Sequence, residues 1–239
     1  TGAVLSGSGI VTGTYVTTAW DFSNSVTISQ ATNASAPLSA ISFSYSGRHV
    51  PNEVNYIIDS PVNDFVISCG STPYDPTSFA TTFDPLLVRW SDQGNAYEWV
   101  PATTNQSGEQ GLSHGSYIVT ANNTRQEILI WTDTALFSMQ YVGPPFVWSF
   151  TLLDQDISIA SQNAVLTVNN VVYWMGRDKF FMYSGRVETL PCTLRQFVYN
   201  DINYDQLSQV TAGANEGYNE IWWFYPSANS TINDRYVVY

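Results

Sequence analysis

The sequence has little positive charge. Its 239 residues include 8 Lys and Arg against 20 Asp and Glu, which gives a formal net charge of −12. Proteins that hold nucleic acid tightly neutralise backbone phosphates with clustered Lys and Arg. The composition therefore argues against a protein that grips nucleic acid.

Cysteine and histidine are almost absent. Cys69 and Cys192 are too few for a disulfide scaffold, and their separation matches no zinc motif, so we expect buried free thiols. His49 and His114 have no carboxylate or cysteine at ligand spacing, which disfavours a metal site or a Ser-His-Asp triad. SGSGIVTG, residues 6–13, lacks the Lys of a phosphate-binding loop. The sequence therefore predicts no cofactor and no metal.

Long apolar runs are also missing. No stretch approaches the roughly 20 apolar residues that cross a bilayer, so membrane insertion is not expected. The chain begins TGAVLSGSG, without Met and without the basic start of a signal peptide, and it stops at DRYVVY within an apolar run. From these two ends we expect a fragment of a longer protein.

Aromatic residues make up 15% of the chain and charged residues only 12%, while strong helix formers are scarce. Several stretches place two apolar runs around a polar turn, a pattern that predicts β-hairpins. They are VNYIIDSPVNDFVISCG (54–70), LLVRWSDQGNAYEWVP (86–101), ILIWTDTALFSMQYVG (128–143), VVYWMGRDKFFMYSGRV (171–187) and EIWWFYPSANSTINDRYVVY (220–239).

The remaining stretches are rich in Ser, Thr, Gly and Asn. Residues 1–50 are a strand-rich segment of unclear role, in which ISFSYSG would place Ile41, Phe43 and Tyr45 on one face of a strand. TTNQSGEQGLSHGS (103–116) and AGANEGYN (212–219) are expected to be loops or crossings between hairpins.

Four tryptophans mark a repeat. Trp90, Trp131, Trp174 and Trp222 recur at intervals of 41, 43 and 48 residues, and a period of this size is typical of β-propeller blades. Blades must stack to bury their faces, so we expect these four side chains to pack between blades. The fold class predicted is all-β, a β-propeller-like array of antiparallel blades over residues 51–239, complete or incomplete.

Acidic residues suggest an enzymatic alternative. A propeller glycoside hydrolase needs carboxylates that converge on the central axis, and the candidates by repeat position are Asp84, Asp133, Asp178, Asp201 and Glu220. Yet Asp92, Asp133 and Asp178 fall in expected turns, where Asp is favoured for conformational reasons. A non-enzymatic protein is therefore favoured. Calcium loops in DQDIS (154–158) or NDINYD (200–205) lack the EF-hand pattern.

A second alternative is a receptor- or glycan-binding propeller. Large flat side chains stack on sugars as readily as they fill a core. Exposed Trp99, Trp148 and Tyr141 would form the binding platform in such a protein.

From Phe83 to the end, four segments have distinctive sequences. FDPLLVRWSDQGNAYEWVP, ILIWTDTALFSMQYVGPPFVWSF, VVYWMGRDKFFMYSGRVETLPC and NEIWWFYPSANSTINDRYVVY, in this order, resemble the tail nozzle or tail tubular structural proteins of short-tailed bacteriophages. The resemblance covers about residues 83–239. It implies a non-enzymatic, β-propeller-based virion subunit, made in the cytoplasm of the host bacterium, that encloses part of the channel for DNA ejection.

The same resemblance implies the partners. They are copies of the chain in an axial ring, tail adaptor and portal-side proteins, and tail fibres or spikes, while genomic DNA passes without specific binding. The net charge of −12 is consistent with a wall that repels the polyanion. Solubility of the subunit before assembly explains that charge equally well.

Overall fold

The structure is a computed structural model, and it describes residues 4–6, 14, 42–44, 49–60, 62–75 and 82–239. The face expected for Ile41, Phe43 and Tyr45 lies outside the described residues. In the N-terminal segment, β1 (Val4–Ser6) and β2 (Ser42–Ser44) pair as antiparallel strands.

The rest of the described chain is mostly β, as the sequence predicted, and forms four antiparallel sheets. The first sheet contains β3 (Val54–Ser60), β4 (Phe65–Ser71), β5 (Asp84–Trp90) and β6 (Gly108–Gly111). The second contains β7 (Ile118–Asn123), β8 (Ile128–Thr132), β9 (Ala135–Gly143) and β10 (Val147–Gln155). Every strand pairs with the strand before or after it, so each sheet is a simple meander.

The third sheet contains β11 (Val165–Val168), β12 (Val171–Met175), β13 (Phe180–Tyr183) and β14 (Val187–Leu190). A short helix, α1 (Arg195–Asp201), and a 3-10 helix, η1 (Tyr204–Gln209), lead to the fourth sheet. That sheet has three strands: β15 (Thr211–Asn215), β16 (Glu220–Tyr225) and β17 (Arg235–Val238). None of the described helices is long and apolar enough to cross a membrane.

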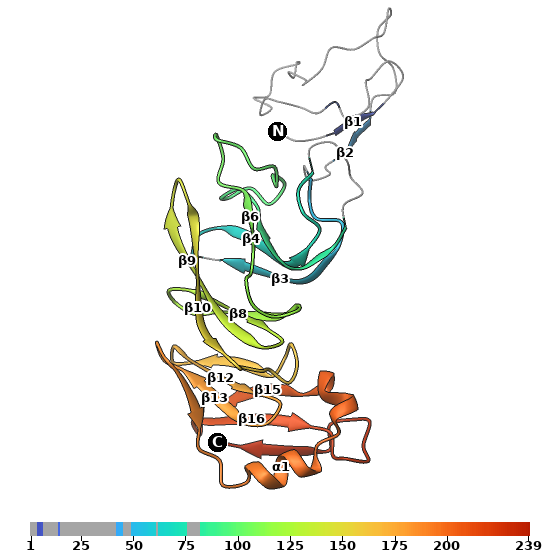
Figure 1. The fold of residues 1–239 in the computed structure, drawn as a ribbon, viewed down its shortest axis with the longest axis vertical. Coiled ribbons are helices and arrows are strands. Elements are labelled where there is room, and N and C mark those ends of the chain that lie inside the picture. Colours follow the sequence, from blue (N-terminus) through green and yellow to red (C-terminus); the bar gives the residue numbers. More distant parts are fainter. Residues whose placement is uncertain (1–3, 7–13, 15–41, 45–48, 61, 76–81) are drawn as a thin grey trace, which may run out of the picture.

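The four sheets follow one another along the long axis of the molecule, and the array does not close on itself (Figure 1). The first strand of each sheet contacts the first strand of the next: β3 lies beside β7, β7 beside β11, and β11 beside β15. Successive sheets are therefore stacked so that their first strands lie next to one another.

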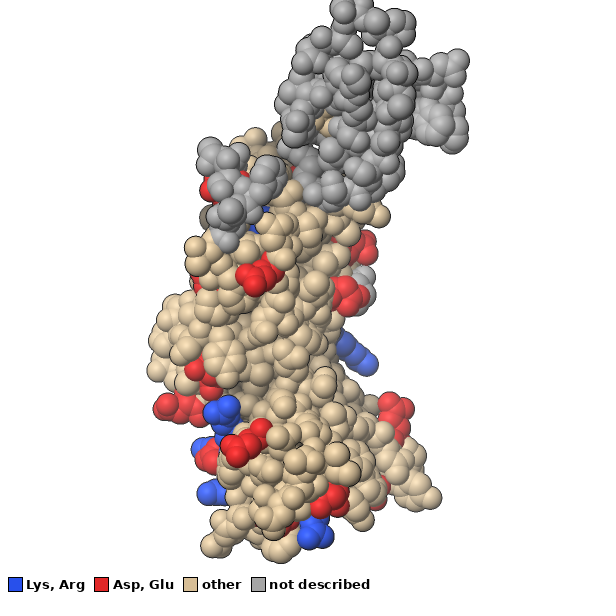
Figure 2. Space-filling view, turned by 90° about the vertical axis from the view of Figure 1, so that its right-hand side faces the viewer, with Lys and Arg blue, Asp and Glu red and all other residues tan. Residues whose placement is uncertain are grey.

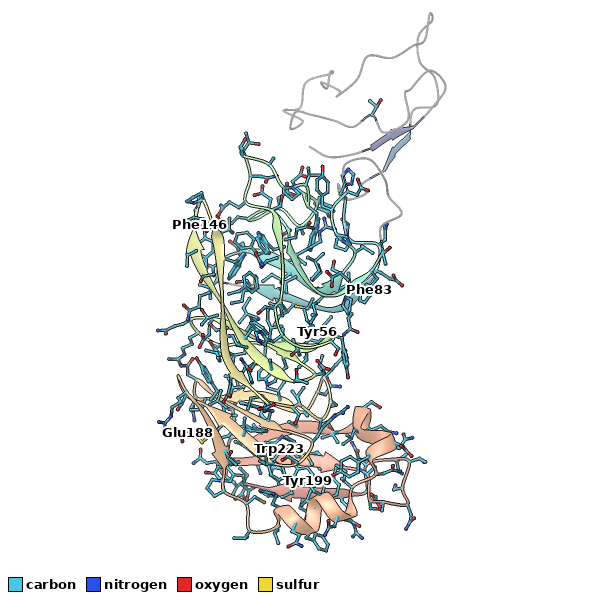
Figure 3. The ribbon with its side chains drawn as sticks, in the orientation of Figure 1. Tyr56, Phe83, Phe146, Glu188, Tyr199 and Trp223 are labelled. Atoms are coloured by element: carbon cyan, nitrogen blue, oxygen red, sulfur yellow. The ribbon has the colours of Figure 1, made fainter. Side chains whose placement is uncertain are left out.

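Aromatic pairs fill each junction between sheets. Trp90 lies 6.0 Å from Phe150 between the first and second sheets, measured between ring centroids. Trp131 meets Trp174 edge to face at 5.4 Å between the second and third. At the last junction, Phe180 and Trp223 lie 5.0 Å apart. Phe180 also contacts Tyr199 of α1, at 5.6 Å between ring centroids, and Figure 3 labels Trp223 and Tyr199 in the lower part of the molecule.

The four marker tryptophans do not occupy equivalent positions. Trp90 lies on the third strand of its sheet, whereas Trp131, Trp174 and Trp222 lie on second strands. The first three are buried, but Trp222 is only half-buried and its neighbour Trp223 is 1% exposed. Successive strand residues point to opposite faces, so only one of two adjacent tryptophans can enter the junction.

Four of the predicted hairpins are confirmed, namely β3–β4, β8–β9, β12–β13 and β16–β17. The hairpin at 86–101 is wrong in its second half, because β5 pairs with β6. Residues 96–101 fold back instead, with the Trp99 indole donating to the carbonyl of Ala96 at 2.9 Å. The predicted loops at 103–116 and 212–219 likewise contain β6 and most of β15.

The β8–β9 turn shows why polar residues interrupt an apolar stretch. The Thr132 hydroxyl accepts a hydrogen bond from the backbone of Ala135 at 2.9 Å, which closes the turn. Asp133 accepts one from the backbone of Ser116 at 2.7 Å, which holds the entry to β7 against the turn. Gly115 fits there because its φ is +104° and an added Cβ would lie 2.4 Å from the Thr132 hydroxyl oxygen.

Candidate functional site: the row of first strands

The four first strands, β3, β7, β11 and β15, lie side by side along the array, and we call them the first-strand row. Their sequences are VNYIIDS, IVTANN, VLTV and TAGAN. Asp59 is the one charged residue among these strands. Apart from Asp59, the polar side chains of the row are therefore neutral hydroxyls and amides.

Asparagine side chains join the first sheet to the second. Asn55 donates from its amide to the carbonyl of Ile118, and Asn123 donates to the carbonyl of Asp59 at 2.8 Å. These bonds run between edge strands of different sheets, whose backbone groups on that side have no neighbouring strand. The amides thus satisfy the backbone and fix the spacing of the two sheets.

Similar bonds continue down the row. The Thr167 hydroxyl lies within hydrogen-bonding reach of the Asn122 side-chain oxygen. Ser161 donates to the carbonyl of Val210, and the backbone of Ala212 donates to the carbonyl of Asn163 at 2.7 Å. Neutral hydrogen bonds therefore link all four sheets, and within the described residues no ion pair joins one first strand to another.

The charged residues lie elsewhere. Figure 2 shows acidic side chains scattered over one face of the molecule, with basic ones mostly in its lower half. In the described residues, three of the four ion pairs involve a cation of the third or fourth sheet: Lys179, Arg186 and Arg235. Scattered charges of both signs do not form a phosphate-binding track.

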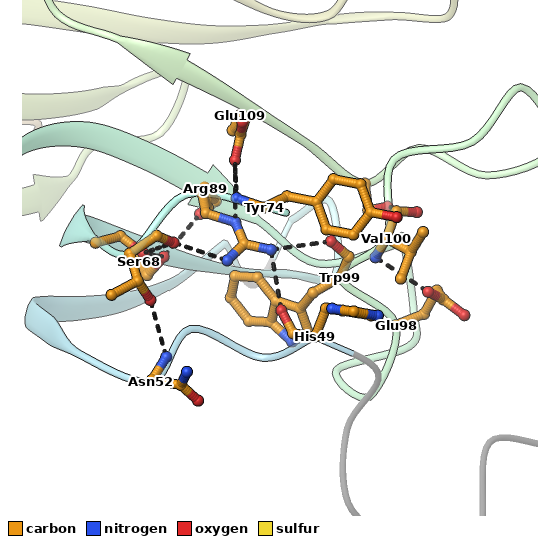
Figure 4. Close-up of polar contacts among 12 residues, drawn as sticks. His49, Asn52, Ser68, Tyr74, Arg89, Glu98, Trp99, Val100 and Glu109 are labelled. Carbon is orange, nitrogen blue, oxygen red and sulfur yellow. Dashed lines mark hydrogen bonds and ion pairs between the residues drawn. The ribbon is translucent and has the colours of Figure 1, made fainter. Parts of the chain in front are cut away.

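A buried arginine on β5, which the sequence did not lead us to expect, binds three segments that lie beside the first sheet. Arg89 is 2% exposed and donates to the carbonyls of Thr72 at 2.8 Å, His49 at 3.0 Å and Trp99 at 3.1 Å (Figure 4). Its Nε lies 3.4 Å from a carboxylate oxygen of Glu109. Burial lowers the pKa of Arg89 and the charge of Glu109 opposes that shift. The one sequence signal for Arg89 was its position as a charged residue within an apolar run, between Val88 and Trp90, which are also buried.

The turn aspartates lie at the ends of strands. Asp133 is in the β8–β9 turn and Asp178 in the β12–β13 turn, where it is exposed. Asp92 follows β5, forms an isolated bridge with Asn95, and accepts a hydrogen bond from the backbone of Gln106 at 2.8 Å. All three therefore sit in turn or loop geometry.

The candidate hydrolase carboxylates are spread over the array. Asp84 begins β5, Asp133 and Asp178 are in turns of the second and third sheets, Asp201 ends α1, and Glu220 begins β16. Glu220 accepts hydrogen bonds from the Trp222 indole at 3.1 Å and the Asn215 amide at 3.2 Å. Across the described part of the chain, no three His, Cys, Asp or Glu side chains gather as a metal site would require.

The aromatic residues considered for glycan binding are largely inside. Trp99 is 4% exposed and Trp148 is 5% exposed, while Tyr141 is half-buried. Trp148 packs against Phe65 and Tyr141 with centroid distances of 5.3 Å and 5.4 Å. They do not present a flat open platform.

No protein-family model matches this chain, and no curated protein matches it either.

Proposed function

We propose that this chain is a structural, non-enzymatic subunit of the tail nozzle of a short-tailed bacteriophage, built from β-propeller blades. The observation that carries the proposal is the alignment of β3, β7, β11 and β15 side by side. In a β-propeller, four-stranded blades surround a central channel, so one edge strand of each blade faces that channel. Four consecutive meanders with adjoining first strands are the arrangement that a series of blades requires.

The chemistry of the first-strand row supports a wall past which DNA can slide. Asp59 is its one charged residue, and its amides and hydroxyls are largely engaged with neighbouring sheets. A surface without Lys or Arg releases no counterions from DNA and so gains little affinity for it. Passage without retention is the property that an ejection channel needs.

The proposed partners follow from this assignment. They are further copies of the chain around the tail axis, adaptor and portal-side proteins, and fibres or spikes. The glycan-binding alternative has less support, because two of its three platform residues are buried in the junctions and loops of the array. The hydrolase alternative has less support because its carboxylates occupy separate elements.

Electron microscopy of the particles of a phage whose genome encodes this chain tests the proposal. Antibody fragments against the exposed Phe146 hairpin tip, 78% exposed, would mark the subunit. We expect the label in a ring around the tail axis. A label on fibre tips would favour receptor binding, and particles without the chain would contradict the proposal.

A further inference from the structure

The last strand of each four-stranded sheet is an edge strand. Among the described strands, β6, β10 and β14 each pair with one neighbour only. The side of such a strand that points away from its neighbour carries a row of backbone N–H and C=O groups. Figure 1 shows β10, with its partner β9, along the left side of the array.

β10 differs from the other two edge strands in length and charge. β6 and β14 have four residues each, and each contains a glutamate, Glu109 or Glu188. β10 has nine residues, VWSFTLLDQ, and its first seven positions carry no charge. Short strands and charged side chains are the usual means by which proteins keep a sheet edge from pairing with another chain. Over residues 147–153, β10 has neither.

The strand register shows which backbone groups of β10 point outward. Hydrogen-bonded and non-bonded pairs alternate along antiparallel strands, and the backbone bond that closes the β7–β8 turn sets this alternation for the whole sheet. Followed through β8 and β9, it places the backbone bonds to β9 at Ser149 and Thr151. Phe150 and Leu152 therefore direct their N–H and C=O groups to the outer edge. No hydrogen bond from the described chain reaches these groups.

The side chains along this edge are also incompletely covered. Phe150 and Leu152 lie on the face toward the first sheet, pack against its core, and are half-buried. Ser149 and Thr151 lie on the other face and are exposed. A further strand beside β10 would pair the outer backbone groups and cover the remaining apolar surface of Phe150 and Leu152.

The sequence of the edge is complementary to itself. In an antiparallel pair of β10 strands related by a two-fold axis at Thr151, Phe150 of each copy stands opposite Leu152 of the other. Each of these pairs can exchange both N–H···O bonds, because both residues direct their groups outward. The two Thr151 side chains then face each other, and cross-strand threonine pairs stabilise a sheet.

We propose that two copies of this chain associate edge to edge through β10, antiparallel about a two-fold axis at Thr151, so that their second sheets form one continuous sheet. Such an isologous contact uses the same strand twice. The inference rests on the backbone register of the second sheet and goes beyond the proposed function, which does not say which surfaces of the copies meet. Closure of a ring requires a further, head-to-tail contact.

Sedimentation velocity of the purified chain over a series of concentrations tests this interface. We expect a dimer that dissociates on dilution. Thr151→Lys should weaken it about tenfold or more, because two like charges would stand directly opposite each other at the axis. Thr151→Glu should weaken it similarly. The side chain of Thr151 is exposed, so both variants should remain folded, as circular dichroism and the melting temperature would report.

A mixture of the two variants gives the sharpest readout. Thr151→Lys and Thr151→Glu chains together should form a mixed dimer about tenfold or more tighter than either variant alone, because opposite charges then meet at the axis. Only a contact that brings Thr151 of both copies together predicts this recovery.

The matched control is Tyr218→Lys, which adds the same charge elsewhere. Tyr218 is 77% exposed and lies in the β15–β16 turn, so the dimer constant should stay within about twofold of that of the unchanged chain. A monomeric unchanged chain, a dimer insensitive to Thr151→Lys, a mixture without recovery, or oligomers larger than two would overturn the interface. None of these results bears on the particle labelling that tests the tail assignment.

Discussion

At the scale of single residues, Arg89 shows how one polar side chain holds several loops. Its guanidinium binds three backbone carbonyls from segments that are far apart in the sequence, and it pairs with Glu109. Glu109 also accepts a hydrogen bond from the backbone of Tyr74 at 2.8 Å. A buried charge is tolerated when hydrogen bonds and an opposite charge offset the loss of its hydration.

Replacing Arg89 should therefore be costly. Arg89→Met keeps an apolar stem but leaves the three carbonyls without their donor and the Glu109 carboxylate without its opposite charge. We expect the free energy of unfolding to fall by about 3–5 kcal/mol, measured by urea denaturation. Arg186→Met is the control, because that side chain is 80% exposed and its pair with Glu188 should contribute under about 1 kcal/mol. Equal losses in both variants would contradict the role given to Arg89.

The two cysteines should differ in reactivity. Cys69 is fully buried on β4, and burial raises the pKa of its thiol to about 12. Cys192 is half-buried and free. Thiolate is the reactive form, so a disulfide reagent at neutral pH should label Cys192 in the native chain and both thiols after unfolding. Cys192→Ser should abolish the native reaction. Fast native labelling of that variant would show that the first sheet opens.

The same shift predicts a loss of stability in alkali. The pKa of the Cys69 thiol is 9.0 when unperturbed and about 12 in the folded chain. The folded state thus holds this proton more tightly, and the contribution is complete below pH 9.0 and lost as pH rises toward 12. Burial also raises the pKa of Tyr183, Tyr199 and Tyr225. Urea unfolding of Cys69→Ala should therefore show a shallower alkaline loss than the unchanged chain, and identical slopes would refute the assignment.

At the scale of elements, β16 presents adjacent tryptophans with opposite surroundings. Trp223 packs on Phe180 and donates from its indole to the carbonyl of Ala164 at 3.1 Å. Trp222 lies on the opposite face of the fourth sheet and is half-buried. The two residues therefore allow the contribution of a buried tryptophan to the free energy of unfolding to be compared with that of a half-buried one in the same strand.

We expect Trp223→Ala to lower the free energy of unfolding by about 3–5 kcal/mol, because it empties a packed junction. Trp222→Ala should cost less than about 1 kcal/mol in the monomer, since its ring is partly in water already. Urea denaturation at low protein concentration separates the two effects. The reverse order would mean that the strand register is shifted by one residue.

The hairpins could be predicted from sequence because their signals are local. Apolar alternation and turn residues such as Asp133 and Asp178 lie within a few positions of one another. Strands β6 and β15 could not, because GEQG and TAGAN have weak strand propensity and are held by their neighbours β5 and β16. The first-strand row was missed for a related reason. Its asparagines resemble loop residues until the sheets are stacked.

At the scale of the whole molecule, the stability of each sheet should depend mainly on the sheets next to it in the array. Each sheet contacts mainly the sheets before and after it, as in repeat proteins whose stability is a sum of nearest-neighbour terms. A weakened junction should therefore loosen the sheet beside it and leave distant sheets protected.

Hydrogen exchange tests this division. Phe180→Ala removes the ring that packs on Trp223, so amides of β16 should exchange faster while those of β4 change little. Phe65→Ala is the matched control at the first junction, where that ring lies 5.3 Å from Trp148, and it should give the reverse pattern. Uniform loss of protection in both variants would mean that the array unfolds as one unit.

The strictly consecutive order of strands bears on how the chain is made. No described sheet waits for a strand from a later part of the sequence, so each can form once its own residues have left the ribosome. Arg89 can form its ion pair with Glu109, and so complete its contacts in the first sheet, as soon as Glu109 has left the ribosome. Each later sheet can then pack against a sheet that has already formed. During synthesis, the exposed apolar surface is therefore expected to be mainly that of the most recently formed sheet.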